Sequence, residues 1–220
     1  MGSNYFRVRV LKEVESYSEK FGYVVKEVEV QSKNSSEYCI KLNEQNLLLK
    51  YKQRSTILFS ANDLKEEIDS IDCVDKISIR KIFPFKIKLV VSYKVPMAIW
   101  QADKMFYFIT TSGDVIKIRN NKNLSQFVLI TGSGAHDRAM SLIKFLSEDK
   151  EIFSKISTAA WIGDRRWNIK FNNGTKLMLP ENSPKEAWDK FVKLQQTHKD
   201  FKRWKYKTVD FRVINKIYAQ

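Results

Sequence analysis

Ser133, His136 and Asp137 lie close together in the stretch Gly132-Ser133-Gly134-Ala135-His136-Asp137, and their types could serve nucleophilic catalysis. A catalytic triad is assembled by the fold from distant parts of a chain, so adjacency in the sequence is not triad geometry. The stretch also lacks the G-x-S-x-G spacing of a nucleophile elbow. We therefore expect it to join a loop to a helix and to cap that helix.

The rest of the sequence offers little for catalysis or metal binding. His136 and His198 have no partner at ligand spacing, so a surface or capping role fits them better. Cys39 and Cys73 belong to no CxxC or Cys/His metal pattern, and the sequence leaves a disulfide between them open. Glycine-rich phosphate loops and an acidic pair suited to acid-base catalysis are both missing. The sequence predicts a protein that is not an enzyme and has no cofactor.

The chain is strongly basic, with 39 Lys and Arg against 25 Asp and Glu and a formal charge of +14. Such an excess suits polyanions such as nucleic acid, acidic headgroups or an anionic envelope. The lysines alternate with apolar residues along predicted strands, however, which favours solvated faces. Basic and aromatic residues also interleave at Trp161–Lys170 and Phe201–Lys207, but no RNP, KH or helix-turn-helix signature accompanies them. We therefore expect no specific nucleic-acid partner.

The sequence has no run of 18 or more apolar residues, so the chain as given is not expected to span a membrane. No signal peptide is recognisable. Met1-Gly2-Ser3 is typical of a start added for expression, so we expect native residues upstream.

The first half of the chain predicts a small α+β unit. Residues 5–21 have the spacing of an amphipathic helix, and residues 23–30 alternate like a strand. A helix is predicted over 37–50, capped by Ser35 or Ser36, and a second one after Ser60, which starts an S-x-x-D motif. Two strands, 74–82 and 85–95, then pair across Phe83-Pro84. Because proline is poorly tolerated in a central strand, Val95-Pro96 is interpreted as a domain junction.

After Pro96 the pattern changes to short strands separated by turns. Asn173-Gly174 predicts a type I′ hairpin turn between 166–171 and the segment that contains Leu177. Ser183-Pro184-Lys185-Glu186 predicts a capped helix with a capping box. Thr208–Val213 alternates as a last strand, and 214–218 could continue it or fold back. We expect an antiparallel sheet flanked by two helices. Its last strand would expose unpaired backbone groups to a partner unless the edge is covered.

With these segments in place, the chain resembles the extracytoplasmic part of the FtsQ/DivIB family of bacterial cell-division proteins, of the alphaproteobacterial type. The resemblance rests on the order and spacing of weak motifs over most of the chain. They are G-Y-x-V (22–25), V-x-x-x-x-I-R-x-x-x-P-x-x-I (74–87), P-x-A-x-W (96–100), S-G-D-V-I (112–116), L-I-T-G (129–132), G-D-R-R-W-N-I (163–169), N-G-x-x-L-x-L-P (173–180) and V-D-F-R (209–212).

The resemblance implies an α+β architecture of two domains. A juxtamembrane helix in 1–22 would precede a POTRA domain (β-α-α-β-β) in 23–94 and an antiparallel β-domain with flanking helices in 95–220. It also implies a transmembrane helix upstream, which would anchor the protein in the inner membrane with this region in the periplasm, enriched at the division septum.

The resemblance further implies a non-catalytic scaffold of the division machinery. Its β-domain would bind FtsB and FtsL, linking early and late septum-formation proteins, and its POTRA domain would bind other division proteins. Carried over by position, the partner-binding residues are Arg165, Arg212, Val213 and Asn215. An arginine rim beside a terminal strand suits an acidic segment that pairs through its backbone. The alternatives are another POTRA-type envelope assembly or protein-binding module and, less favoured, a basic nucleic-acid binder.

Overall fold

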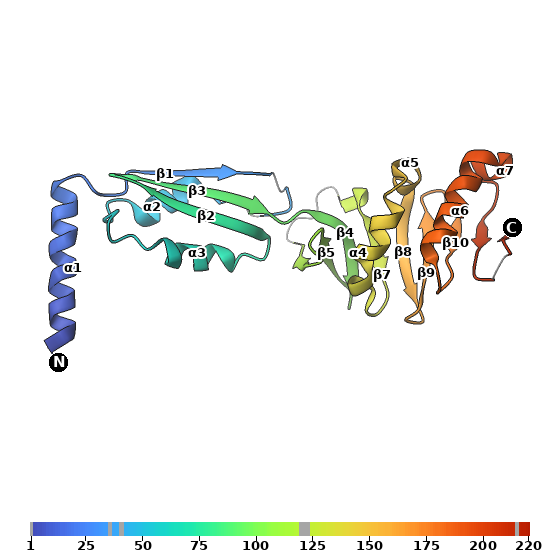
Figure 1. Cartoon of the computed structure of the whole chain (residues 1–220), viewed down its shortest axis with the longest axis horizontal. Coiled ribbons are helices and arrows are strands. Elements are labelled where there is room, and N and C mark those ends of the chain that lie inside the picture. Colours follow the sequence, from blue (N-terminus) through green and yellow to red (C-terminus); the bar gives the residue numbers. More distant parts are fainter. Residues whose placement is uncertain (1, 35–36, 40–41, 119–123, 214–215) are drawn as a thin grey trace. The chain divides into compact units, whose positions relative to one another are not determined.

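The computed structural model describes residues 2–34, 37–39, 42–118, 124–213 and 216–220. The chain divides into two compact units, the N-terminal unit Met1–Lys94 and the C-terminal unit Val95–Gln220. Each unit has its own hydrophobic core, and each is described by itself (Figure 1).

In the described part of the N-terminal unit, three strands form one sheet in the order β1-β3-β2. β1 pairs parallel to β3, and β2 pairs antiparallel to β3. After α1, the elements follow as strand, helix, helix, strand, strand (Figure 1). The elements are α1 (Gly2–Lys20), β1 (Glu27–Ser32), α2 (Glu44–Tyr51), α3 (Ala61–Asp69), β2 (Val74–Ile82) and β3 (Lys86–Tyr93).

The two faces of this sheet differ in chemistry. Alternate residues of β3 are buried against α2 and α3, among them Ile87, Leu89 and Val91. On the other face, Glu29 lies between two lysines, with its carboxylate oxygens 2.7 Å from the Lys86 Nζ and 2.8 Å from the Lys88 Nζ. Hydrogen bonds from these lysines lower the pKa of the Glu29 carboxyl to about 2. The strict alternation of β3 therefore separates a core from a charged face.

The start of α2 differs from the prediction. α2 begins at Glu44 because the Asn43 side chain caps it, accepting hydrogen bonds from the backbone N–H groups of Gln45 and Asn46. The predicted caps Ser35 and Ser36 lie outside the described residues.

Two further features of the N-terminal unit were raised by the sequence. The Ser60 cap of α3 is confirmed, because the Asp63 N–H donates to the Ser60 Oγ over 3.2 Å. A disulfide joins Cys39 and Cys73, whose Cα atoms lie 5.8 Å apart. It links the segment before α2 to the start of β2.

The C-terminal unit alternates strands with helices. Its helices are α4 (Ala135–Leu146), α5 (Lys150–Phe153), α6 (Pro184–Thr197) and α7 (Lys199–Lys202), with a 3-10 turn at Leu124–Gln126. Its strands are β4 (Pro96–Ala102), β5 (Met105–Thr110), β6 (Val115–Lys117), β7 (Val128–Thr131), β8 (Ile156–Ile162), β9 (Arg166–Phe171), β10 (Lys176–Met178), β11 (Thr208–Asp210) and β12 (Tyr218–Ala219).

Within the described residues these strands form one nine-stranded sheet, here called the large sheet, in the order β12-β11-β10-β9-β8-β7-β4-β5-β6. The prediction of an antiparallel sheet is wrong, because β4–β7, β7–β8 and β10–β11 are parallel pairs. The parallel direction of two of these pairs, β7–β8 and β10–β11, follows from helical connections. α4 and α5 connect β7 to β8, and α6 and α7 connect β10 to β11, so each connection returns the chain to the end where it started.

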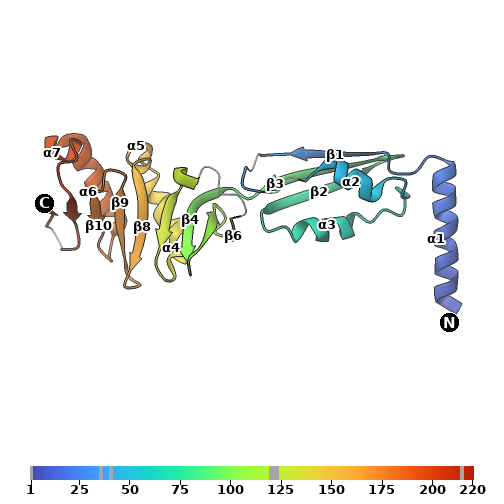
Figure 2. The same ribbon diagram turned by 180° about the vertical axis from the view of Figure 1, so that it is seen from behind.

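The helices cover one face of the large sheet. Trp188 and Phe191 of α6 and Leu142 of α4 are buried in the same core as Ile130 and Ile169 of the strands. Trp167 lies in this core and Trp100 packs against it. Figures 1 and 2 show the strands and their covering helices from opposite sides. β9, β10 and β11 are therefore held by the core that they share with these helices.

Three predictions of local geometry are wrong. Gly174 has φ +89° but Asn173 is not in the left-handed region, so the turn is not type I′; Asn173 Oδ1 instead accepts a hydrogen bond from the Thr175 N–H. Ser183 has φ 53° and makes no side-chain cap, so the capping box is not formed. The stretch 132–137 joins a loop to α4 as predicted, but α4 starts after Gly134, at φ 67°, with no side-chain cap.

Candidate functional site

The last strands of the large sheet form its C-terminal edge. β12 pairs antiparallel with β11, with Ala219 opposite Val209 and Tyr218 opposite Asp210. The chain therefore folds back after β11, which was one of the two outcomes left open by the sequence. In the described residues β12 is the outermost strand and spans only Tyr218–Ala219. A short, terminal strand thus covers the edge of β11.

The hydrogen bonds of β12 show which of its backbone groups face outward. Gln220 and Thr208 exchange two hydrogen bonds, of 3.0 Å and 2.9 Å, so they are a hydrogen-bonded pair. In an antiparallel ladder such pairs alternate with pairs whose N–H and C=O groups point away from each other. Ala219 and Val209 are the next pair. The N–H and C=O of Ala219 therefore point toward the open edge.

A groove of about 420 Å³ lies beside this edge. It runs between the start of α6 and the segment that follows β11. Val213 and Ile217, two of its lining side chains, are 45% and 43% exposed, and the neighbouring Tyr218 is 53% exposed. The groove is lined by Pro180, Asn182, Ser183, Glu186, Ala187, Lys190, Phe211, Arg212, Val213, Lys216 and Ile217. Exposed apolar side chains and charged side chains thus meet next to an open strand edge.

Arg212 lines the groove but its charge is paired within the molecule. The guanidinium Nε lies 2.9 Å and 3.0 Å from the two Asp210 carboxylate oxygens, and Nη2 lies 2.6 Å from Oδ2. The Arg212 N–H also donates to Asp210 Oδ1 over 2.9 Å. These bonds lower the pKa of the Asp210 carboxyl, with a smaller contribution from the charge of Arg166. Arg212 therefore shapes the end of β11 and is not a free cation.

Arg165 is exposed in the turn between β8 and β9 and does not line the groove. Its neighbour Arg166 is the arginine that acts electrostatically on Asp210. The Nε of Arg166 is buried and has no hydrogen-bond partner in the described part of the chain. The structure thus brings Arg166 and Arg212 to one carboxylate.

The sequence prediction of this site was incomplete. Asn215 lies outside the described residues. Ile217 and Tyr218 were not chosen, although Tyr218 is the first residue of the edge strand. Two consecutive large apolar residues near a chain end are a signal that could have found them, since they are rarely left exposed without use.

Of the residues that first suggested chemistry, His136 packs on an aromatic ring and lies beside Asp137. The His136 ring packs on Trp100 with centroids 4.1 Å apart, and its Nε2 lies 3.3 Å from the adjacent Asp137 carboxylate. Among the described residues, no three His, Cys, Asp or Glu side chains are grouped as metal ligands. None of the described helices has the length and apolar character needed to cross a membrane.

A family model for "Cell division protein FtsQ/DivIB, C-terminal" matches residues 98–212, just over half of the chain. The chain belongs to the FtsQ/DivIB family. The match covers β4 to β11 and ends at Arg212, beside the groove. The resemblance read from the sequence is therefore confirmed, and with it the assignment to cell division.

Curated FtsQ proteins of alphaproteobacteria are similar over longer stretches. The FtsQ of Rhizobium meliloti is 25% identical over 149 residues, which are 68% of this chain and 48% of the relative. That of Rickettsia bellii is 25% identical over 169 residues, 77% of this chain and 62% of the relative. That of Bartonella bacilliformis is 26% identical over 163 residues, 74% and 53% respectively. The chain thus matches about half to three fifths of the length of these relatives.

One solved structure is that of the major extracytoplasmic domain of DivIB from Geobacillus stearothermophilus, a bacterial cell division protein, described as its trans isomer. It is 13% identical with a TM-score of 0.37, over 46% of this chain and 91% of that one.

Proposed function

We propose that this chain is the extracytoplasmic part of a non-catalytic scaffold of the bacterial division machinery. It binds FtsB-like and FtsL-like division proteins through the C-terminal edge of the large sheet, and so links early and late septum-formation proteins. The observation that carries this proposal is the open edge of β12, whose outward backbone groups at Ala219 lie beside a partly apolar groove. Strand addition at a sheet edge uses both features, since backbone bonds give affinity and side-chain pockets give specificity.

Within this proposal the domains keep the boundaries expected from the family. The POTRA domain occupies 23–94 and binds other division proteins, and the β-domain occupies 95–220. Residues 1–22 form the juxtamembrane helix that follows an inner-membrane anchor, and the chain works in the periplasm at the septum. The Cys39–Cys73 disulfide supports a place outside the cytoplasm, because disulfides persist in oxidising compartments.

The partner-binding residues also need revision within this proposal. Val213 and Ile217 offer apolar contact, and the exposed Arg165, which has no ion pair within the described residues, offers charge to an acidic partner segment. Because Arg212 is bound to Asp210, we assign it the role of holding the end of β11 in place. Asn215 stays a proposal from the family alone.

The test is a proline substitution that removes the outward N–H. Ala219→Pro leaves the β11 pairing intact, because the Ala219 N–H is not used there, but it blocks an added strand. We expect at least about a tenfold loss of affinity for the soluble part of the FtsB-like protein from the same cell, measured by calorimetry. Ala219→Ser keeps the N–H and should bind like the unchanged chain. Equal binding by all three chains would rule out strand addition at β12.

A further inference from the structure

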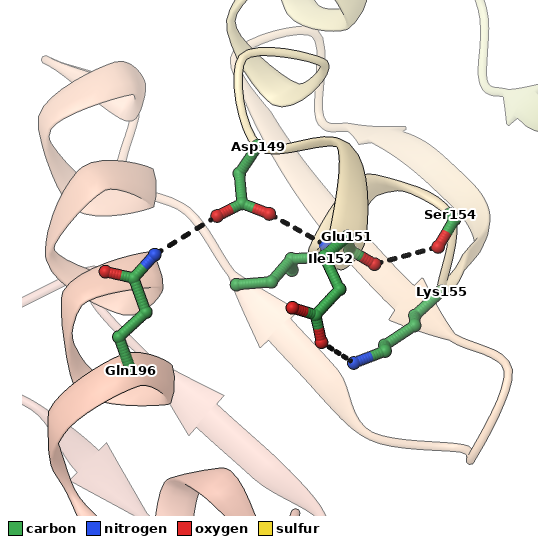
Figure 3. A network of polar contacts seen from close by, with 6 residues as sticks. All are labelled: Asp149, Glu151, Ile152, Ser154, Lys155 and Gln196. Atoms are coloured by element: carbon green, nitrogen blue, oxygen red, sulfur yellow. Dashed lines mark hydrogen bonds and ion pairs between the residues drawn. The ribbon is translucent and has the colours of Figure 1, made fainter.

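A second groove, of about 360 Å³, lies on the helical side of the C-terminal unit between α5 and the α6–α7 segment. Figure 3 shows its rim, where Asp149 caps α5 and Gln196 of α6 reaches the same carboxylate over 3.3 Å. Glu151 accepts a hydrogen bond of 2.8 Å from the Lys155 Nζ. These contacts hold the walls of the groove in place. They do not involve Gln195 and Lys202, which also line it.

Gln195 is the available polar group deepest in this groove. Its side chain is only 9% exposed and lines the groove, yet its amide has no hydrogen-bond partner in the part of the chain that the structure describes. Its amide atoms are not among the fully buried, unpartnered atoms of the described residues, so they remain accessible from the groove. The amide can both donate and accept, which matches the N–H and C=O groups of a polypeptide. Gln195 therefore points to an occupant with such groups.

The chain segment beside the groove carries a large excess of basic residues. Residues 193–207 contain six Lys and Arg but a single acidic residue, Asp200. Among the described side chains, Lys205 is the only one of these cations with a carboxylate at ion-pair distance, at 3.9 Å from Asp200. Lys202 lines the groove itself. The charge there is not neutralised by the fold, so it favours an anionic occupant.

The side chains near the groove favour neither a lipid bilayer nor a nucleic acid as the anionic partner. No large apolar side chain between Ile162 and Val213 is exposed, so nothing is offered for insertion into a bilayer. The Trp204 ring packs against Phe171 at 4.8 Å and the Tyr206 ring against Phe201 at 5.0 Å, so these aromatic rings are engaged by the core and are poor platforms for nucleic-acid bases.

The rim also carries the carboxylates of Asp149 and Glu151, which repel a polyphosphate, charged at every unit, more strongly than a polypeptide whose carboxylates are spaced along the chain. The same carboxylates can accept hydrogen bonds from backbone N–H groups. A segment that combines a peptide backbone with spaced carboxylates fits both the rim and the basic surface.

We propose that the groove between α5 and α6–α7, together with the basic segment 199–207, is a docking site for a carboxylate-rich polypeptide segment of a partner protein. The segment places backbone groups on Gln195 and carboxylates on Lys202 and Arg203. This site is separate from the β12 edge, and it does not depend on strand addition there.

The experiment uses a fluorescent peptide of Glu-Glu-Gly-Ser repeats, and the same peptide with Gln in place of Glu, titrated with the full chain. We expect the Glu peptide to bind and the Gln peptide to bind at least about tenfold more weakly. Reversal of two charges in Lys202→Glu/Arg203→Glu should weaken Glu-peptide binding at least about tenfold. The matched reversal Arg138→Glu/Lys144→Glu, on exposed positions of α4, should change it less than about twofold.

Gln195→Met tests the groove rather than the charge. It keeps the size of the side chain and the net charge, so a loss of about three- to fivefold in affinity with an unchanged salt dependence supports the proposal. Equal effects of the two double reversals would overturn it, since net charge alone would then explain binding. Tighter binding of an oligodeoxythymidylate through Lys202 and Arg203 would overturn it in favour of nucleic acid. Ala219→Pro should leave Glu-peptide binding unchanged, which separates this proposal from strand addition.

Discussion

The two ends of β9, β10 and β11 both carry cations, but the most closely held cation, Arg212, lies at one end. At the end beside the first groove, the Arg212 guanidinium makes three hydrogen bonds to Asp210, and Arg166 acts on the same carboxylate. At the other end, Lys170 and Lys176 lie directly opposite each other in the β9–β10 pair. The basic segment 199–207 ends close by, because the Lys176 N–H donates to the Lys207 C=O.

This difference separates cations that build the fold from cations that remain for a partner. An arginine held by a carboxylate contributes to the shape of a strand end and has little charge left to offer. Like charges placed opposite each other oppose folding, so they are retained at a cost in stability. The resemblance read from the sequence implied Arg212 as a contact, whereas the geometry makes the opposite end the more open cationic surface.

The largest expected effect on stability comes from the Arg212 end of the strands, where one residue belongs both to the core and to the lining of the first groove. Phe211 is 7% exposed, belongs to the core of the unit and also lines the groove. Phe211→Ala should lower the free energy of unfolding by about 3–4 kcal/mol because it leaves a cavity. Lys202→Ala at the open end should change it by less than about 0.5 kcal/mol. Denaturant unfolding measures both, and equal losses would break the contrast between the ends.

A smaller effect on the free energy of unfolding distinguishes Arg212 from Arg203. Arg212→Ala should lower the free energy of unfolding at neutral pH by about 0.5 kcal/mol, since the pair is partly solvent-exposed. Arg203→Ala, in the basic segment, should leave it unchanged or raise it slightly. Unfolding of the three chains in urea at one pH gives the comparison. A loss in Arg203→Ala as large as in Arg212→Ala would show that Arg203 also has a structural partner.

The pH dependence of the Arg212 effect follows from the carboxyl that it binds. In the folded chain the pKa of Asp210 is held below its ordinary value of 3.8. The contribution of the pair is therefore complete above that ordinary value and is lost as the pH falls through the lower folded pKa. We expect the stability difference between the unchanged chain and Arg212→Ala to be constant from pH 7 to about pH 5 and to shrink below about pH 4. A difference that grows at acid pH would contradict the assignment.

The smallest expected effect is a gain, not a loss, in the free energy of unfolding. Lys176→Glu replaces a like-charged cross-strand pair with an opposite one against Lys170, so it should raise the free energy of unfolding by about 0.3–0.5 kcal/mol. Lys176→Gln, which only removes the repulsion, should give a smaller gain. Thermal unfolding at low ionic strength is the suitable measurement, and added salt should remove the gain from both variants. A loss of stability in Lys176→Glu would show that the lysine pair is not strained.

Local pattern was a good guide where one strand has one buried face. The predicted strand 166–171 agrees with β9 because Trp167, Ile169 and Phe171 alternate with polar residues. The Ser60 cap is of the same kind, since its partner lies three residues away. The failed caps at Ser183 and Gly134 show the limit of this guide, because the chain enters both helices in the left-handed region and no side chain there accepts a bond from the first turn.

The candidate site was predicted only in part for a related reason. The motif V-D-F-R located the strand end, but it could not reveal that Arg212 is bound to Asp210 two residues earlier. Neither could it reveal that the strand after the turn returns to cover β11. Lys202 and Gln195 were not chosen because their role depends on α5, about 50 residues earlier in the chain.

The sequence by itself determined the order of most strands and helices, the strongly basic charge and the family, because each is encoded in composition or in short-range spacing. The tertiary structure alone decided that the large sheet is mixed, that Arg212 is neutralised and that Gln195 lies without a partner beside a basic surface. The physical reason is common to all three. Strand direction, ion pairing and burial depend on groups that are brought together only when helices return the chain across the sheet.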